Sequence, residues 1–303
     1  MSVPLSEKKN IKLSRDDKIY YAAIYFILSL LLLIILYPLI FIVSSSFSSP
    51  YAVSTGRVVF FPVEPSLEGY KAVMQHKSIL SGYRNTIFYT TAGTVINLIA
   101  TITAAYALAR KTLPGRSIIT FLFTFTMIFS GGMIPSYMLL RDLGILNTAW
   151  SMVVPGAIAV YNLIIAKTFI ENSIPQELLE ASKIDGCTDF KYFSQIVLPL
   201  SKSIVAVLVL FYAVAHWNSY FDAFLYLNDR SLFPLQIVLR EVLIANTIDA
   251  SLVVDPELAT AKQGMADLLK YALIIVSTVP VMCLYPFVQK YFITGVMIGS
   301  IKG

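Results

Sequence analysis

Residues with chemical reactivity are few and scattered in this 303-residue chain. The histidines His76 and His216 lie far apart, and the cysteines Cys187 and Cys283 belong to no CxxC or histidine-rich run. A hydrolase needs a nucleophile beside a base, and a metal site needs several ligands close together. The sequence therefore predicts no catalytic residue and no metal site. It also lacks the run G-x-x-x-x-G-K followed by Ser or Thr, so we expect no ATP binding by this chain.

A polar and aromatic cluster lies at the end of one apolar run, between residues 212 and 222. Polar side chains in a membrane helix usually face the interior of a bundle or a water-filled cavity rather than lipid. Aromatic rings and amide groups also suit sugars, which combine apolar ring faces with hydroxyl groups. A single histidine such as His216 is more often a satisfied interior residue than a catalytic one. The candidates for a translocation pathway are Tyr212, His216, Trp217, Asn218, Tyr220 and Asp222.

The composition indicates a membrane protein that must carry these residues on helices. Hydrophobic residues make up 57% of the chain and charged residues only 14%, whereas soluble domains carry about 25% charged residues. Roughly 20 apolar residues in a helix span the hydrocarbon of a bilayer. Six runs without Asp, Glu, Lys or Arg approach or exceed that length, which predicts an all-α membrane protein with six transmembrane helices. These runs are residues 19–47, 86–109, 117–140, 143–166, 203–221 and 271–289.

The basic residues predict how the spans are oriented. Lys8, Lys9 and Lys12 precede the first run as in a signal peptide, but the apolar core is too long and no A-x-A cleavage site follows. An uncleaved span with a cytoplasmic N-terminus is therefore favoured. With that orientation, most of the 23 Lys and Arg residues fall in segments assigned inside, as the positive-inside rule requires. We expect a multi-pass protein of the cytoplasmic (inner) membrane with both termini in the cytoplasm.

The predicted spans divide the chain into a cytoplasmic tail (1–18), the first helix (19–47), an extracytoplasmic loop (48–85), a five-helix core (86–289) containing a cytoplasmic loop (167–202), and a cytoplasmic tail (290–303). A second long outer loop, 225–267, could contact a soluble partner or be a solvated connector. The basic residues are not gathered on one face with aromatic residues, so we expect no nucleic-acid partner.

Glycine and proline interrupt the third run. Gly131, Gly132 and Pro135 lie near its outer end, and such residues in membrane helices usually mark a kink or close packing. A gating role is the alternative.

The cytoplasmic loop between the fourth and fifth runs carries helix signals of its own. Ser173 and Gln176 match the capping-box spacing, and a proline falls in the first turn, so a helix is predicted from there to Gly186. A second short helix is predicted from near Thr188 to just before Pro199. By composition alone, this pair could be an amphipathic connector on the cytoplasmic face.

The same loop carries a known signature. The pattern E-A-A, three residues, G, nine residues, I, one residue, L-P is met at every spacing by Glu180, Ala181, Ser182, Gly186, Ile196, Leu198 and Pro199. The second alanine of the pattern is Ser182 here, and the alanine that often follows its glycine is Cys187. Both replacements are small and should leave helix packing intact. The chain thereby resembles the permeases of binding-protein-dependent ABC importers.

The resemblance implies a type I importer permease fold in which the EAA loop is a coupling helix seated in a cleft of the ATPase subunit. Gly186 would supply the positive φ of the turn, and the small Ala181 and Ser182 would let the helix enter a groove. The residues expected to couple to the ATPase are Glu180, Ala181, Ser182, Asp185, Gly186, Ile196, Leu198 and Pro199. Closure of the ATPase dimer would switch the spans between outward-open and inward-open states.

The C-terminal residues narrow the resemblance. The run 289–292, then Gly295, Gly299 and Lys302, is similar to the ending of MalG-type permeases from the carbohydrate uptake group. In that group an extended tail reaches into the ATPase dimer interface, which implies ATPase contacts for Gln289, Gly295, Gly299 and Lys302. Residues 129–135 are similar to permeases of lipoprotein-dependent, complex-oligosaccharide importers, which implies an oligosaccharide substrate.

The resemblance also implies a set of partners. They are a second homologous permease subunit, two ATPase subunits, an extracytoplasmic sugar-binding protein and membrane lipid. ATP and Mg would be held by the ATPase, with no cofactor in this chain. Three alternatives stay open at this point. An importer permease for a non-sugar solute would share the loop, a secondary carrier would need ionisable groups at mid-membrane, and an intramembrane enzyme would need a paired nucleophile and base.

Overall fold

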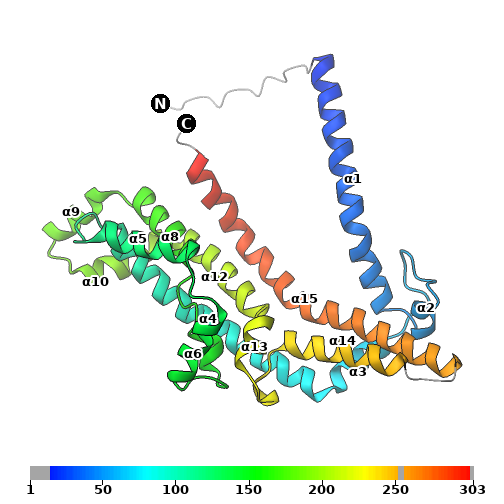
Figure 1. The fold of residues 1–303 in the computed structure, drawn as a ribbon. Helices are drawn as coiled ribbons and strands as arrows, with labels where there is room; N and C mark the ends of the chain where they lie inside the picture. Colours follow the sequence, from blue (N-terminus) through cyan, green and yellow to red (C-terminus); the bar gives the residue numbers. More distant parts are fainter. Residues whose placement is uncertain (1–13, 252–255, 301–303) are drawn as a thin grey trace.

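The computed structural model describes residues 14–251 and 256–300, and all regular structure within those residues is helical (Figure 1). The predicted all-α class is confirmed. Three helices are long and apolar enough to cross a membrane: α1 (Arg15–Ser46), α4 (Lys77–Ala109) and the part Gln263–Pro286 of α15 (Pro256–Ser300). They cover the spans predicted at 19–47, 86–109 and 271–289. Each is longer than its apolar run, because the helical hydrogen bonding continues into flanking polar residues.

The third predicted span, 117–140, is a bent pair of helices. The helices α5 (Arg116–Ile128) and α6 (Met133–Asp142) meet at 116°. Gly132 lies between them with φ 87°, a backbone conformation that residues with a Cβ rarely adopt. The predicted interruption is therefore confirmed as a sharp break. The 13 residues of α5 extend only about 20 Å, less than the hydrocarbon thickness.

The fourth predicted span, 143–166, is wrong as a continuous helix. Within it lie α7 (Trp150–Val153) and the start of α8 (Val160–Ser173), separated by a turn at Pro155-Gly156 in which Gly156 has φ 71°. Helix α8 continues past the predicted end at residue 166. Its charged residues Lys167 and Glu171 pair four residues apart on the helix surface, an arrangement that stabilises a helix.

The fifth predicted span, 203–221, corresponds to α12 (Lys202–Trp217) followed by the short α13 (Tyr220–Tyr226). The helical segment before it bends by 78° into α12. Counting each bent pair as one span gives up to five helices that could cross a membrane among the described residues. The count of six stays a prediction.

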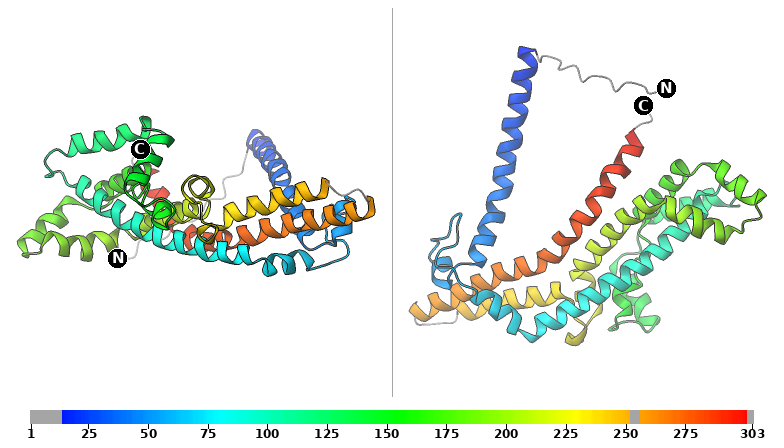
Figure 2. Two further views of the ribbon diagram at one scale, coloured as in Figure 1. Left: turned by 60° about the horizontal axis from the view of Figure 1, so that its bottom comes forward. Right: turned by 180° about the vertical axis from the view of Figure 1, so that it is seen from behind.

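The two loops that the sequence places outside are folded rather than extended. Residues 48–85 form α2 (Pro50–Ser54), α3 (Glu68–Gln75) and the first turns of α4, and residues 225–267 contain α14 (Leu235–Ser251) and the first turns of α15. Hydrogen bonds from Ser49 and Arg57 lower the pKa of Glu64 and tie the 48–64 loop together. These elements lie on one side of the molecule, whereas α9, α10 and the start of α1 lie toward the other (Figures 1 and 2).

Two buried clusters hold the bundle together around α4. One, on the side of α14, contains Tyr89, Trp217 and Leu235, and the other, on the side of α8, contains Leu163 and Leu208. Helix α4 packs most extensively against α12 and α8. Helix α1 stands apart along most of its length (Figure 1), and no residue of its most apolar stretch is buried. Such a surface needs lipid or another membrane helix to cover it.

Candidate coupling site and translocation pathway

The loop 167–202 folds into a bracket, which we define as α9 (Gln176–Ile184), the turn 185–188 and α10 (Asp189–Tyr192). Gly186 turns the chain with φ 70°, and the Cys187 N–H donates to the Ser182 carbonyl at 2.9 Å, closing α9. The Thr188 hydroxyl accepts a hydrogen bond from the Lys191 N–H at 3.3 Å and begins α10. The predicted turn at Gly186 and second helix near Thr188 are confirmed.

Two local predictions for this loop are wrong. Ser173 is the last residue of α8 rather than a helix cap, and Pro175 stands at the N-cap of α9 without a side-chain hydrogen bond. The Ser173 hydroxyl is buried without a hydrogen-bond partner. The second helix does not end before Pro199, because a π-helical turn (Phe193–Val197) leads into α11 (Leu198–Leu200). A proline in the first turn of a helix has no N–H that the helix would need.

The EAA residues divide into an exposed group and an anchoring group. Glu180, Ala181, Asp185 and Gly186 are exposed on α9 and its turn, whereas Ser182 is 6% exposed and its hydroxyl donates to the Leu179 carbonyl at 2.7 Å. The later residues Ile196 and Leu198 pack against the cluster around α8, while Pro199 is exposed. The motif therefore presents one end outward and fastens the other to the bundle.

Sequence reasoning missed two apolar residues at the tip of the bracket. Ile184 is 87% exposed and Phe190 is 78% exposed, although neither lies in a predicted span. Ile184 stands between Lys183 and Asp185, and Phe190 stands between Asp189 and Lys191. An apolar residue between two charged residues is the signal that could have identified both. Large apolar side chains grouped on a polar protein surface commonly mark a partner interface.

Ionic contacts connect the bracket to the ends of the spans. The Arg110 guanidinium at the end of α4 donates to Asp189 of α10 and to the Tyr106 hydroxyl, both at 2.7 Å. Arg116 of α5 pairs with Glu171 of α8. An exposed pair contributes about 0.2–1 kcal/mol, but the Arg110 side chain is only 15% exposed. The bracket is thus fixed to α4 as well as to its own flanking helices.

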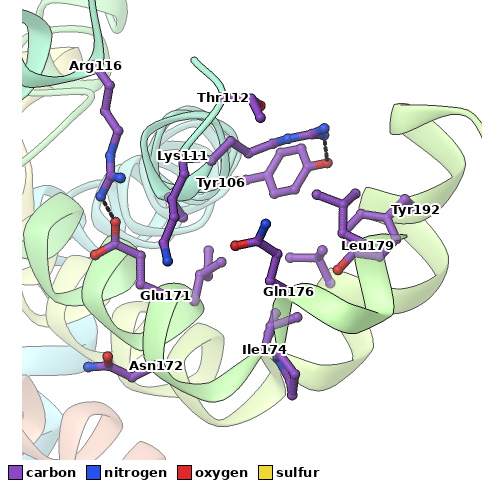
Figure 3. A pocket seen from close by; sticks show the side chains of 15 residues that line it. Tyr106, Lys111, Thr112, Arg116, Glu171, Asn172, Ile174, Gln176, Leu179 and Tyr192 are labelled. Carbon is purple, nitrogen blue, oxygen red and sulfur yellow. Dashed lines mark hydrogen bonds and ion pairs between the residues drawn. The ribbon is translucent and has the colours of Figure 1, made fainter. Parts of the chain in front are cut away.

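A pocket of about 440 Å³ lies under the bracket. It is enclosed by the end of α4, the end of α8 and the first turn of α9, and Figure 3 shows Lys111 and Gln176 reaching toward its middle while the Arg116–Glu171 pair lies at its edge. No group of three or more His, Cys, Asp or Glu side chains that could hold a metal ion occurs in the part of the chain that the structure describes.

Three of the six candidate pathway residues point into the bundle. The Tyr212 hydroxyl lies 2.6 Å from the Thr101 hydroxyl and accepts from the Ala159 N–H at 3.2 Å. His216 Nε2 lies 2.6 Å from Asn97 Oδ1, and Trp217 Nε1 donates to the Ser277 carbonyl at 3.0 Å. Their polar atoms join α12 to its neighbours.

The other three candidates lie just beyond the C-terminal end of α12. Asn218 is exposed and donates to the Val214 carbonyl of its own helix at 2.9 Å. The Arg240 guanidinium carbon lies 4.7 Å from the centre of the Tyr220 ring, and Asp222 is exposed. The structure therefore does not bring all six residues to one surface.

Asn97 is a central polar residue of the bundle that sequence reasoning did not single out. It is 1% exposed, and its amide donates to the carbonyls of Gly156 and Ala157 at 3.0 and 2.9 Å as well as contacting His216. It thereby holds the broken fourth span against α4 and α12. An asparagine among threonines and aliphatic residues in an apolar run only weakly indicates a buried polar contact, because the residues that it contacts are distant in sequence.

We expect Asn97→Ala to lower the free energy of unfolding by roughly 1–3 kcal/mol, since it leaves buried polar groups without partners. Thermal unfolding of the purified protein in mild detergent measures this change. Asn218→Ala is the matched control, because among the described residues its side-chain amide donates only to Val214 of its own helix, and it should change stability by no more than about 0.5 kcal/mol. Equal losses in the two variants would contradict the role given to Asn97.

The predicted tail contacts fall on or beyond the end of α15. Gln289 is exposed on this helix, and the helix continues to Ser300. The extended conformation expected around Gly295 and Gly299 is therefore wrong, because both lie in helical backbone that continues the last span. Lys302 lies outside the described residues.

Residues 78–298 match the family described as "Binding-protein-dependent transport system inner membrane component". The chain belongs to this family. The family's component is a membrane permease of a transport system and not an enzyme, and the sequence-based resemblance to ABC importer permeases is confirmed.

Relatives of this permease cover nearly its whole length. It is 38% identical over 290 residues to the "Polygalacturonan/rhamnogalacturonan transport system permease protein YtcP" of Bacillus subtilis, covering 95% of this chain and 99% of the relative. It is 41% identical over 272 residues to "Protein LplC" of the same organism, covering 88% and 89%. A crystal structure of a bacterial ABC transporter involved in the import of the acidic polysaccharide alginate contains a chain with a TM-score of 0.84 and 35% identity, covering 93% of this permease and 100% of that chain.

Proposed function

We propose that this chain is one permease subunit of an ATP-driven importer that moves an oligosaccharide across the cytoplasmic membrane by alternating access. The observation that carries the proposal is the bracket, where the exposed EAA residues stand with two uncovered apolar side chains, Ile184 and Phe190. The bracket is also fastened to α4 through Arg110. A partner that moves the bracket would therefore move the spans with it.

The ATPase subunits are the proposed partners at the bracket, and they would hold the ATP and Mg. A homologous second permease would complete the pathway, since the exposed apolar faces, α1 above all, exceed what one chain covers. A sugar-binding protein would dock on the opposite side, where α2, α3 and α14 lie. Both termini would be cytoplasmic and six spans would cross the membrane. Gln289, Gly295, Gly299 and Lys302 remain proposed ATPase contacts.

The proposed substrate is an acidic oligosaccharide. This class is supported by two similar proteins that match almost the whole chain, one named for polygalacturonan and rhamnogalacturonan transport and one described in the import of alginate. Polygalacturonan and alginate are both built of uronate sugars. A non-sugar solute is the weaker candidate, because it would leave the similarity of this chain to two polysaccharide transport proteins unexplained.

Uptake into proteoliposomes tests this function. The permease, its partner permease, the ATPase and the binding protein are reconstituted, and entry of tritiated tetragalacturonate is measured with ATP or a non-hydrolysable analogue at the ATPase face. We expect uptake only with ATP and only with the binding protein. Uptake driven by an ion gradient without ATP would contradict the proposal and favour a secondary carrier. ATP-dependent uptake of non-sugar solutes alone would show that only the substrate class is wrong.

A further inference from the structure

A second pocket, of about 410 Å³, lies on the side of the molecule opposite the bracket. Helix α13, the segment 227–233 and helix α14 form its walls. The aromatic, amide and charged side chains that line it are Tyr220, Phe224, Asn228, Phe233, Arg240 and Glu241. Only Tyr220 of these belongs to the predicted pathway residues. Aromatic rings beside a few charged and amide groups are typical of sugar sites rather than of sites for purely apolar ligands.

Two aromatic rings form a platform on one wall of this pocket. The rings of Tyr220 and Phe224 are stacked with centroids 6.0 Å apart and planes inclined by 23°. Phe224 is 62% exposed, so its ring remains uncovered outside a membrane helix. The C–H face of a pyranose ring packs on such a surface, because it is apolar and flat.

A cation lies beside the platform. The Arg240 guanidinium stacks over the Tyr220 ring at 4.7 Å, and it forms no ion pair with the side chains that the structure describes. The neighbouring carboxylate of Glu241 is paired instead with Arg230, at 3.8 Å. A guanidinium held by ring stacking keeps its forked N–H donors available for a carboxylate.

The wall of the pocket that residues 227–233 form is held in place by hydrogen bonds to residues distant in sequence. The Asn147 side chain accepts from the N–H groups of Asn228 and Asp229 at 2.8 and 2.9 Å, and Asn147 itself has φ 54°. The Asn85 amide donates to the carbonyls of Ser231 and Phe233 at 2.7 and 3.0 Å. Side chains distant in sequence thus fix the 227–233 segment. A wall that is already ordered loses little entropy when a ligand binds.

We propose that this pocket binds a uronate ring of the oligosaccharide on the outer side, with the exposed Phe224 ring stacking on the sugar, Tyr220 holding Arg240 beside it, and Arg240 pairing with the sugar carboxylate. The inference rests on the proposed importer function and assigns a substrate-contacting surface to this subunit. It predicts that recognition depends on the carboxylate charge as well as on the ring.

Photocrosslinking in the reconstituted importer tests contact with the sugar. A photoreactive phenylalanine analogue is placed at Phe224, or at Phe221 of the same helix as a control, since Phe221 is 57% exposed but does not line the pocket. Tritiated tetragalacturonate should label position 224 and not position 221. An adduct between position 224 and the binding protein, or no label at 224 in an importer that takes up the sugar, would overturn the inference.

A substitution at Arg240 tests the charge. We expect Arg240→Gln to lower the tetragalacturonate uptake rate at low concentration by roughly tenfold, from the loss of charge-assisted hydrogen bonds, and Arg240→Lys to restore part of it. Arg141→Gln is the control, an exposed arginine on α6 outside the pocket. Equal uptake by the wild type and Arg240→Gln would overturn the inference and leave the importer function intact. ATP-driven uptake of neutral sugars alone would also overturn it.

Discussion

Replacing Ile184 and Phe190 together by aspartate is expected to release the ATPase subunits from the permease while leaving the permease folded. Burying each of these side chains in an interface contributes about 1.5–3 kcal/mol, so the double variant should weaken the association by roughly a hundredfold or more. Both side chains are almost fully exposed in the isolated chain. Their loss should therefore cost the permease itself little stability.

Co-purification in mild detergent, scored as ATPase bound per permease, measures this effect. Phe61→Asp is the matched control, because Phe61 is 81% exposed but lies in the predicted outer loop 48–85, far from the bracket in the sequence. It should retain the ATPase. Full retention by the double variant, or equal loss in the control, would show that the bracket is not the ATPase contact.

Gly93→Val is expected to separate α4 from α12. A Cβ built on Gly93 would lie inside the contact distance of the His216 ring, so the imidazole would have to leave its place and its contact with Asn97. Overpacking of this kind costs roughly 1–3 kcal/mol, and the lost hydrogen bond adds about 1 kcal/mol. Small residues allow such close approach of membrane helices.

Thermal unfolding in detergent measures the change, and a second-site variant tests its cause. Adding His216→Ala to Gly93→Val should recover part of the lost stability, because it removes the side chain that the new methyl groups meet. Gly131→Val serves as the control, since the nearest atom to a Cβ there is Pro135 Cβ at 3.7 Å. A double variant less stable than Gly93→Val would contradict this explanation.

The sequence predicted what depends on local pattern. The apolar runs identified α1, α4 and α15 because a bilayer imposes one length and one composition on any spanning helix. Gly186 and Thr188 marked the bracket, because a positive φ and a helix cap each need a particular residue type. The EAA spacing indicated the family because it is also a local pattern of residue types.

Features that depend on contacts distant in sequence could not be predicted. The break at Pro155-Gly156 leaves carbonyl groups that accept hydrogen bonds from Asn97, which is 59 residues away from Gly156. No local sequence pattern at either site predicts this contact. His216 was placed in a possible pathway because its run was polar. Its packing against Gly93 depends on the way α4 and α12 pack together, which the sequence near either residue does not determine. Ser173 matched a capping pattern, but in the structure it ends α8 and its hydroxyl makes no hydrogen bond, because α9 begins after Pro175 instead.

The exposure of Ile184 and Phe190 was not predicted either, although their position within a charged run could have drawn attention to both residues. Alternating charges and apolar residues in a short loop are compatible with packing onto the bundle or with facing outward. The burial of Ser182 and the packing of Ile196 against the bundle decide between them. The uncovered side chains are therefore a property of the folded bracket rather than of its sequence.

Site-specific photocrosslinking from position 190 in native membranes tests the central claim most directly. A photoreactive phenylalanine analogue replaces Phe190, or Phe61 as the control, and the adducts are identified by mass spectrometry. We predict that position 190 captures an ATPase subunit and that position 61 does not. Capture of no ATPase from position 190, in membranes where the assembled importer transports its sugar, would contradict the account.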